Sequence, residues 1–134
     1  MLMPTVKRYM SRQPWTITPS AKMSEAHRVM REHHIRHLPV LDQGKLVGIV
    51  SERDLHLIET LPGSDPEDVT VDEAMIADVY AVSPDEEVDK VIEKMADNKL
   101  GSALVVTRNG KVEGIFTTID ALQCFADVLR RAMA

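Results

Sequence analysis

The chain has 134 residues, enough for one domain of ordinary size or two very small ones that share a core. Apolar residues make up 44% of it, which is typical of globular proteins and excludes the disordered and fibrous classes. The 16 basic and 21 acidic residues give a net charge of −5, so we expect no extended nucleic-acid interface, which requires clustered lysine and arginine. Because no apolar run is long enough for a membrane span or a secretory leader, and Cys124 has no second cysteine to pair with, we expect a cytoplasmic protein.

The sequence contains an internal repeat. A shift of 65 residues pairs Val6 with Val71, Met10 with Met75, Pro19 with Pro84, Met30 with Met95 and Val40 with Val105. One extra residue in the second turn changes the shift to 66, which pairs Gly44 with Gly110, Gly48 with Gly114 and Asp54 with Asp120. Residues 61–70, LPGSDPEDVT, have the composition of a linker. We therefore divide the sequence into a first repeat, residues 1–62, and a second, residues 63–134.

Both copies predict the same elements in the same order. Residues 15–17 and 79–82 are short β-prone runs. Thr18-Pro19 and Ser83-Pro84 then predict helix starts, with proline at the first helical position and, in the second copy, a capping box between Ser83 and Glu86. The helices that follow have one apolar face, formed by Met23, Ala26 and Met30 in the first copy and by Val88, Val91, Ile92 and Met95 in the second.

Two hairpins and two final helices complete the prediction. Residues 38–50 and 103–116 each contain two apolar strands joined by a glycine turn, and helices are expected at about 52–60 and 118–132. Each half has roughly 60 residues, too few to bury a comfortable core alone. The expected fold is α/β (α+β), with two β-α-β-β-α repeats packed sheet to sheet around a pseudo-twofold axis and a cleft between them.

The two segments GIVSERD (48–54) and GIFTTID (114–120) carry the clearest motif. Ser51 with Asp54, and Thr117 with Asp120, have the spacing of an N-cap hydroxyl and an acid at the third helical position, which stabilises a helix start without any ligand. A helix start also presents backbone N–H groups to anions. A hydroxyl beside it can donate to phosphate, and a carboxylate one turn away can accept both hydroxyls of a ribose.

These residues resemble the cystathionine β-synthase (CBS) domain, which usually occurs as tandem pairs. The resemblance covers nearly the whole chain and rests on the doubled G-h-h-[ST]-x-x-D motif, the IRHLPVLD segment (35–42), and the openings that run from Met10 and Met75 to the Thr-Pro and Ser-Pro pairs. It implies that an adenine nucleotide, AMP, ADP or ATP, binds in the cleft as a regulatory ligand. Carried over to this chain, it implies Asp54 and Asp120 as ribose acceptors, Ser51 and Thr117 as their hydroxyl partners, and Ile17, Pro39, Val82 and Leu104 around the adenine.

The two copies differ in charge. The first has Arg36 and His37 before its strand and Arg53 inside the motif, whereas the second has Gly101, Ser102, Thr118 and Ile119 at the corresponding positions. A di- or triphosphate needs several charge-assisted partners, and guanidinium groups can bind it bidentately. We therefore expect the first motif to be the better polyphosphate site. The second, which has Ile119 where the first has Arg53 and only Lys99 nearby, is expected to bind a nucleoside or monophosphate, or nothing.

No pattern of a catalytic nucleophile appears, and the clustered histidines lack the three or four convergent ligands of a zinc site, so we predict neither an enzyme nor a metal site. The function predicted is a regulatory sensor that acts in trans on a protein partner. The resemblance also implies a homodimer, consistent with apolar residues of the last helix and its counterpart: Leu122, Phe125, Ala126, Val128, Leu129, Leu55 and Ile58. The alternatives are a ligand-free dimerisation scaffold and a binder of another adenosyl ligand, S-adenosylmethionine or NAD.

Overall fold

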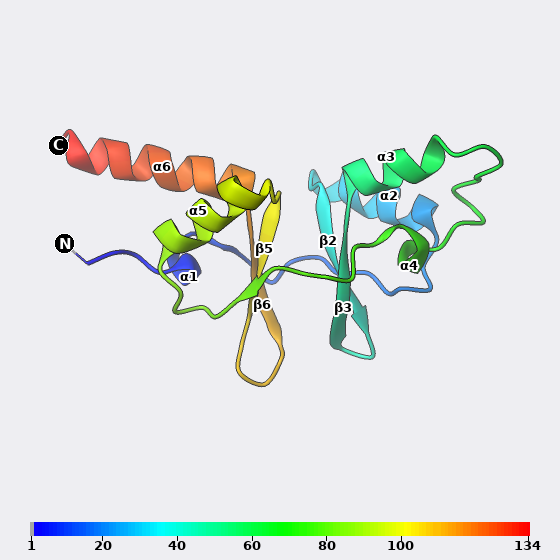
Figure 1. Cartoon of the computed structure of the whole chain (residues 1–134), viewed down its shortest axis with the longest axis horizontal. Coiled ribbons are helices and arrows are strands. Elements are labelled where there is room, and N and C mark those ends of the chain that lie inside the picture. Colours follow the sequence, from blue (N-terminus) through cyan, green and yellow to red (C-terminus); the bar gives the residue numbers. More distant parts are fainter. Residues whose placement is uncertain (1) are drawn as a thin grey trace. The chain divides into compact units, whose positions relative to one another are not determined.

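The computed structural model describes residues 2–134 and divides the chain into two compact units of mixed α and β structure. One unit is Trp15–Val79, and the other combines the N-terminal residues up to Pro14 with Tyr80–Ala134 (Figure 1). The compact units and the sequence repeats are thus different sets of residues. The boundary between residues 62 and 63 divides the sequence into two repeats and not the fold into two units. It stays a prediction.

The unit Trp15–Val79 consists of one hairpin covered by helices. Its elements are α2 (Met23–His33), β2 (His37–Asp42), β3 (Lys45–Ser51), α3 (Glu52–Glu59) and α4 (Val71–Ala74). The antiparallel strands β2 and β3 meet at a two-residue turn, where Gln43 and Gly44 have φ angles of 51° and 80°. Positive φ at both central residues matches the right-handed twist of the strands, so the glycine turn predicted from the sequence is confirmed.

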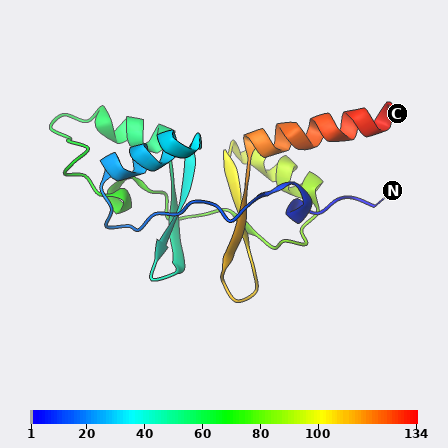
Figure 2. The ribbon, with the colours of Figure 1, turned by 180° about the vertical axis from the view of Figure 1, so that it is seen from behind.

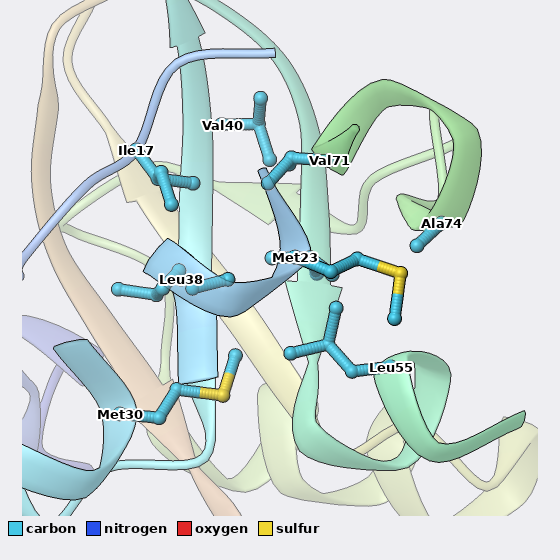
Figure 3. Packing of buried hydrophobic residues seen from close by; sticks show 10 residues of the cluster. Ile17, Met23, Met30, Leu38, Val40, Leu55, Val71 and Ala74 are labelled. Carbon is cyan, nitrogen blue, oxygen red and sulfur yellow. The ribbon is translucent and has the colours of Figure 1, made fainter. Parts of the chain in front are cut away.

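Side chains from all of these elements form the core of this unit. Met23 and Met30 of α2, Leu38 of β2, Leu55 of α3 and Val71 of α4 are buried and converge in one cluster (Figure 3). Val71 lies beyond the linker, in the second sequence repeat, yet it is fully buried here. The burial of Leu55 places it in this core, so it takes no part in the apolar helix surface expected for a dimer.

The second unit is built around a four-stranded sheet. Its elements are α1 (Val6–Tyr9), β1 (Ser11–Arg12), β4 (Ala81–Val82), α5 (Val88–Asn98), β5 (Ser102–Val106), β6 (Val112–Thr117) and α6 (Thr118–Ala132). The strand order is β1-β6-β5-β4, with β4 parallel to β5 and the other pairs antiparallel. Figure 2 shows the N-terminal segment passing beside β6. The N-terminal helix of each sequence repeat therefore packs in the unit formed mainly by the other repeat.

The predicted starts of the two central helices are wrong. α2 begins at Met23 and α5 at Val88, four residues after the prolines that were expected at the first helical position. Pro19 and Pro84 instead occupy the second position of turns, in which Thr18 O accepts from Ala21 N and Ser83 O from Glu86 N. Proline fixes the φ angle that this turn position requires, and the same residue pair signals both structures. The predicted capping box of Ser83 with Glu86 is absent, since Ser83 Oγ accepts from Asp85 N instead.

One backbone difference separates the copies. In the second unit Leu104 N donates to Tyr80 O, and β4 pairs with β5 over two residues. At the corresponding position of the first copy stands Pro39, which has no N–H, and the expected strand at 15–17 is reduced to an isolated bridge between Ile17 and Val40. Proline therefore leaves the carbonyl of Trp15 without the donor that its counterpart Tyr80 receives.

Candidate functional site

The two strand-to-helix junctions have the geometry predicted for them. Ser51 Oγ accepts from Asp54 N at 3.1 Å, and Asp54 Oδ2 accepts from Ser51 N at 3.0 Å and from Ser51 Oγ at 2.8 Å. Thr117 and Asp120 repeat this arrangement, with 2.8 Å between Thr117 N and Asp120 Oδ2. The predicted N-cap hydroxyl and third-position acid are confirmed at both helix starts, where each pair forms a capping box. Each motif thus holds its carboxylate rigidly at the first turn of a helix.

The glycine of each motif has a structural reason of its own. A Cβ atom built on Gly48 would lie 2.7 Å from Met75 Sδ and 2.9 Å from Ile76 O. On Gly114 it would lie 2.4 Å from Met10 Sδ and 2.9 Å from Ser11 O. Only glycine lets the two segments Met75–Ile76 and Met10–Ser11, called the crossing segments below, approach β3 and β6 this closely. Each glycine therefore determines which residue of its crossing segment lies beside the motif, a role that sequence analysis did not assign to it.

Most N–H groups at the two helix starts are already used. Glu52 N donates to Arg36 O at 2.9 Å, and Thr118 N donates to Gly101 O at 3.2 Å. The third-position amides bond to the cap hydroxyls. Within residues 2–134, the N–H groups of Arg53 and Ile119 at the second position have no acceptor. Each junction therefore presents one directed backbone donor to an anion, fewer than a helix start offers when its cap is open.

The first-copy junction gathers the cationic residues that the sequence predicted. Arg36 precedes β2, His37 opens it opposite Ser51, and Arg53 lies in the first turn of α3. Arg36 and Arg53 are exposed, and none of the ion pairs within residues 2–134 involves them. The junction that holds Asp54 therefore includes two exposed arginines that form no ion pair within the described residues.

His37 is half-buried, and its burial lowers the pKa of its imidazole, with Arg36 acting in the same direction and the negative charge of Asp54 opposing them. His37 is therefore a neutral hydrogen-bonding group near pH 7. Its counterpart in the second copy is Ser102, opposite Thr117. Ile119, which occupies the position of Arg53 in the second copy, is 57% exposed and carries no charge. The surface of the second junction therefore lacks the positive charge that Arg53 gives to the first.

The residues predicted to surround adenine lie in two different units. Ile17 N donates to Pro39 O at 3.0 Å in the unit Trp15–Val79, and both side chains are buried. Val82 pairs with Val105 in the other unit, next to Leu104, which is fully buried. Thr118 is exposed at the start of α6. With their side chains inside each unit, Pro39 and Leu104 have only backbone atoms to offer a ligand.

Ser11 is the one residue at a junction that sequence analysis missed. Its hydroxyl donates to Asp120 Oδ1 at 3.0 Å, and Asp120 is only 7% exposed. The corresponding residue of the other unit is Ile76, which bridges to Ile49 as Ser11 pairs with Ile115. Ser11 precedes Asp120 by 109 positions, so the one signal that could have found it is the alignment of the repeats, which places a serine in one copy opposite an isoleucine in the other.

Between residues 2 and 134 no three His, Cys, Asp or Glu side chains converge as a metal ion would require. No helix of the described chain has the length and apolar character needed to cross a membrane.

Two α+β repeats with equivalent capped strand-to-helix junctions define a tandem-repeat module. The family model of the CBS domain matches residues 6–57 and 68–127, and the chain belongs to this family. The CBS domain pair of protein MJ0100, solved in complex with 5′-methylthioadenosine and S-adenosyl-L-methionine, is 31% identical, with a TM-score of 0.85 over 94% of this chain and 98% of that one. The Vibrio cholerae protein AcuB is also 31% identical, with a TM-score of 0.85 over 96% of this chain and 95% of that chain.

Some relatives are much longer than this chain. Protein MJ1232 of Methanocaldococcus jannaschii is 32% identical over 112 residues, which are 84% of this chain but 36% of the relative. Protein MJ1225 of the same organism is 29% identical over 88% of this chain and 46% of its own length. The chain thus spans about a third to a half of these two curated relatives. What the family resemblance implied for the fold, two CBS repeats of mixed α and β structure, is confirmed.

Proposed function

We propose that this protein is a regulatory module that binds an adenine nucleotide, with the first-copy junction as its principal site. The observation that carries the proposal is the arrangement around Asp54. One carboxylate oxygen is fixed by Ser51, the other accepts no hydrogen bond from residues 2–134, and the same junction includes the exposed arginines Arg36 and Arg53. A carboxylate that accepts hydroxyl groups beside cations that accept phosphate matches the two polar ends of a nucleotide.

The charge around the site favours nucleotides with more than one phosphate. Arg36 and Arg53 are available for bidentate bonds, the N–H of Arg53 adds a directed donor, and His37 adds a neutral one. Ile17 and Pro39 support the adenine in this proposal, beside the carbonyl of Trp15, to which Pro39 offers no donor. Val82, Leu104, Thr117, Thr118 and Asp120 form the weaker second position, for a nucleoside or monophosphate if it is filled at all.

Isothermal titration calorimetry with AMP, ADP and ATP tests this proposal. We expect binding of all three, with affinity rising from AMP to ATP. A parallel thermal-shift series supports it, because a ligand at 100 times its Kd adds about 2.7 kcal/mol to the free energy of unfolding. If none of the three nucleotides at millimolar concentration produces heat or moves the Tm, the motifs act only as helix caps and the ligand-free scaffold replaces the sensor.

S-adenosylmethionine is the second candidate ligand, because the CBS pair of MJ0100, 31% identical, was solved with it and with 5′-methylthioadenosine. The ribose contacts would be the same. Its sulfonium and ammonium groups are positive, as are Arg36 and Arg53, the two exposed arginines of this junction. Coulomb repulsion therefore favours phosphate over sulfonium at this site. Competition between S-adenosylmethionine and ATP in one titration separates the candidates, and displacement of ATP by equimolar S-adenosylmethionine would reverse the order proposed.

The proposal includes an output in trans through a protein partner, and a homodimer. Support for the dimer comes from α6, where Leu122, Phe125, Val128 and Leu129 are between 43% and 64% exposed. Such a row of apolar side chains is typical of an association surface. Cytoplasmic localisation and a regulatory rather than catalytic role belong to the same proposal.

A further inference from the structure

The two motif carboxylates differ in how many of their oxygens the protein occupies. Asp120 Oδ2 accepts from Thr117 N and Thr117 Oγ1, and its Oδ1 accepts from Ser11 Oγ at 3.0 Å. Asp54 Oδ2 accepts the equivalent pair from Ser51, but within residues 2–134 its Oδ1 accepts no hydrogen bond. Since no buried side-chain oxygen of the described residues lacks a partner, Oδ1 of Asp54 is open to solvent.

The cause of this difference is one residue of each crossing segment. Ser11 pairs with Ile115, and Ile76 bridges to Ile49, so the two occupy equivalent positions beside the closely approached glycines. Serine has a hydroxyl that donates to the neighbouring carboxylate, whereas isoleucine has no donor. Asp120 is accordingly 7% exposed with both oxygens engaged, and Asp54 is half-buried with one oxygen free.

We propose that Ser11 and Ile76 determine which of the two motif carboxylates can bind the hydroxyl groups of a ribose. Ser11 blocks Asp120 of the second motif by donating a hydrogen bond to it, whereas Ile76 has no donor and leaves Asp54 of the first motif available. A ribose binds a carboxylate by donating its hydroxyl groups to accessible lone pairs. Both lone pairs of Asp54 Oδ1 are free of donors from the described residues, whereas Ser11 takes one of those on Asp120 Oδ1 and covers a carboxylate that is only 7% exposed. To reach Asp120 the ligand has to displace Ser11 from a charge-assisted hydrogen bond, and no such exchange is needed at Asp54. The protein therefore binds one nucleotide per chain, at Asp54, an inference that rests on the proposed function and refines it.

Single substitutions of Ser11 and of Ile76, each followed by calorimetric titration with AMP, test the inference. AMP is the probe because the second junction has no arginine to hold further phosphates. Wild type is expected to bind one AMP per chain, and Ser11→Ala to bind two, because Asp120 Oδ1 is released. Ser11→Thr is the matched control: it keeps the hydroxyl in β1 and is expected to keep one site.

The reciprocal variant is Ile76→Ser, which supplies a hydroxyl to Asp54 and is expected to weaken AMP binding about tenfold. Its matched control, Ile76→Ala, removes the same isoleucine without adding a donor and is expected to stay within twofold of wild type. Unfolding curves for all four variants verify that they are folded. A change common to Ile76→Ser and Ile76→Ala would reflect packing alone and would overturn the inference.

The outcomes also separate this inference from the proposed function. Two AMP molecules bound per wild-type chain, or one bound per chain in Ser11→Ala, would overturn the control by Ser11 while nucleotide binding stands. If neither wild type nor any variant binds AMP, ADP or ATP, the proposed function fails and the inference fails with it. A 2′-deoxy-AMP titration adds a direct readout: the loss of affinity relative to AMP is expected in wild type and is expected to shrink in Ile76→Ser.

Discussion

Asp54 is the residue on which nucleotide binding is expected to depend most. Asp54→Ala should weaken AMP binding by about 1.5–3 kcal/mol, the usual scale for lost hydrogen bonds to a charged group. The free energy of unfolding should fall by less, about 1 kcal/mol, through the lost capping box. Calorimetry and urea unfolding measure the two effects. Asp42→Ala is the charge-matched control, because Asp42 is exposed at the opposite end of β2, and unchanged affinity in Asp54→Ala would remove Asp54 from the site.

Arg53 is expected to distinguish ATP from AMP. Arg53→Ala should reduce ATP affinity more than AMP affinity by about 1 kcal/mol or more, because only the longer ligand presents extra charge to the guanidinium. The gap should shrink as salt rises, since part of it is screened Coulomb attraction. Titrations at two salt concentrations measure it, with Arg31→Ala on the exposed surface of α2 as control. Equal losses for both nucleotides would assign Arg53 to the α-phosphate or to the shape of the loop.

His37 is expected to make stability depend on pH. Its pKa in the folded protein is lowered by burial, so the folded state binds fewer protons than the unfolded state in acid. Its contribution to stability is complete above about pH 6.5, the ordinary histidine pKa, and is lost as the pH falls below that value. Between pH 7 and 5, wild type should lose stability more steeply than His37→Ser, by less than about 1.4 kcal/mol per pH unit. Urea unfolding at several pH values measures this, and an equal loss of unfolding free energy in the two proteins between pH 7 and 5 would contradict it.

At the scale of single residues, local spacing predicted chemistry well and long-range contacts poorly. The N-cap hydroxyl and third-position acid of both motifs were predicted because the two residues are three positions apart and need only the helix itself. The hydrogen bond from Ser11 to Asp120 spans 109 positions and depends on how a crossing segment lies against β6. The close approach that requires Gly48 and Gly114 depends on the same tertiary arrangement. No pattern within one repeat could have given either.

At the scale of elements, periodicity located the helices and hairpins, and turn chemistry misplaced the helix starts. The expected final helices at 52–60 and 118–132 agree with α3 and α6, and the two hairpins agree with β2–β3 and β5–β6. Thr-Pro and Ser-Pro are favoured both at helix starts and in turns, and here the turns were formed. The strand at 15–17 was lost because Pro39 provides no donor across from it, a tertiary pairing that local β-propensity does not contain.

The ends of α2 and α5 provide a test of backbone strain. Both helices end at a left-handed residue that is not glycine: His34 has φ 54° and Lys99 has φ 55°. Because a Cβ atom disfavours this conformation, Lys99→Gly should raise the free energy of unfolding by about 0.5–1 kcal/mol. Glu93→Gly, at an exposed interior position of α5, should lower it by about 1 kcal/mol. Urea unfolding measures both, and a loss of stability in Lys99→Gly would contradict the strain argument.

At the scale of the whole molecule, the exchange of N-terminal helices joins the two repeats. Val6 of α1 is fully buried in the core that contains α5 and β6, and Val71 of α4 is fully buried in the core that contains α2 and β2. Each core therefore includes side chains from both sequence repeats, as expected for halves too small to be stable separately. The duplication was readable from the sequence, but the exchange was not, because the linker composition at 61–70 says only where the chain leaves one copy.

Self-association is expected to depend on the exposed apolar face of α6. Phe125 is 57% exposed on this helix, and Leu122 and Leu129 lie one turn to either side of it, with exposed fractions of 64% and 48%. Phe125→Glu places a charge in the centre of that face and should convert a dimer to a monomer, because an unpaired charge at the core of an interface is strongly unfavourable. Light scattering coupled to size-exclusion chromatography measures the mass.

Gln123→Glu is the matched control for that variant. It adds the same charge at an exposed position of α6 outside the apolar row, so it should remain dimeric. Circular dichroism separates the remaining outcomes, because Phe125 is exposed and its replacement should leave the fold intact. If Phe125→Glu is folded and still dimeric, the interface lies elsewhere on the chain. If it unfolds while Gln123→Glu does not, the face of α6 is part of the intrachain core, and the association surface has to be sought away from this helix.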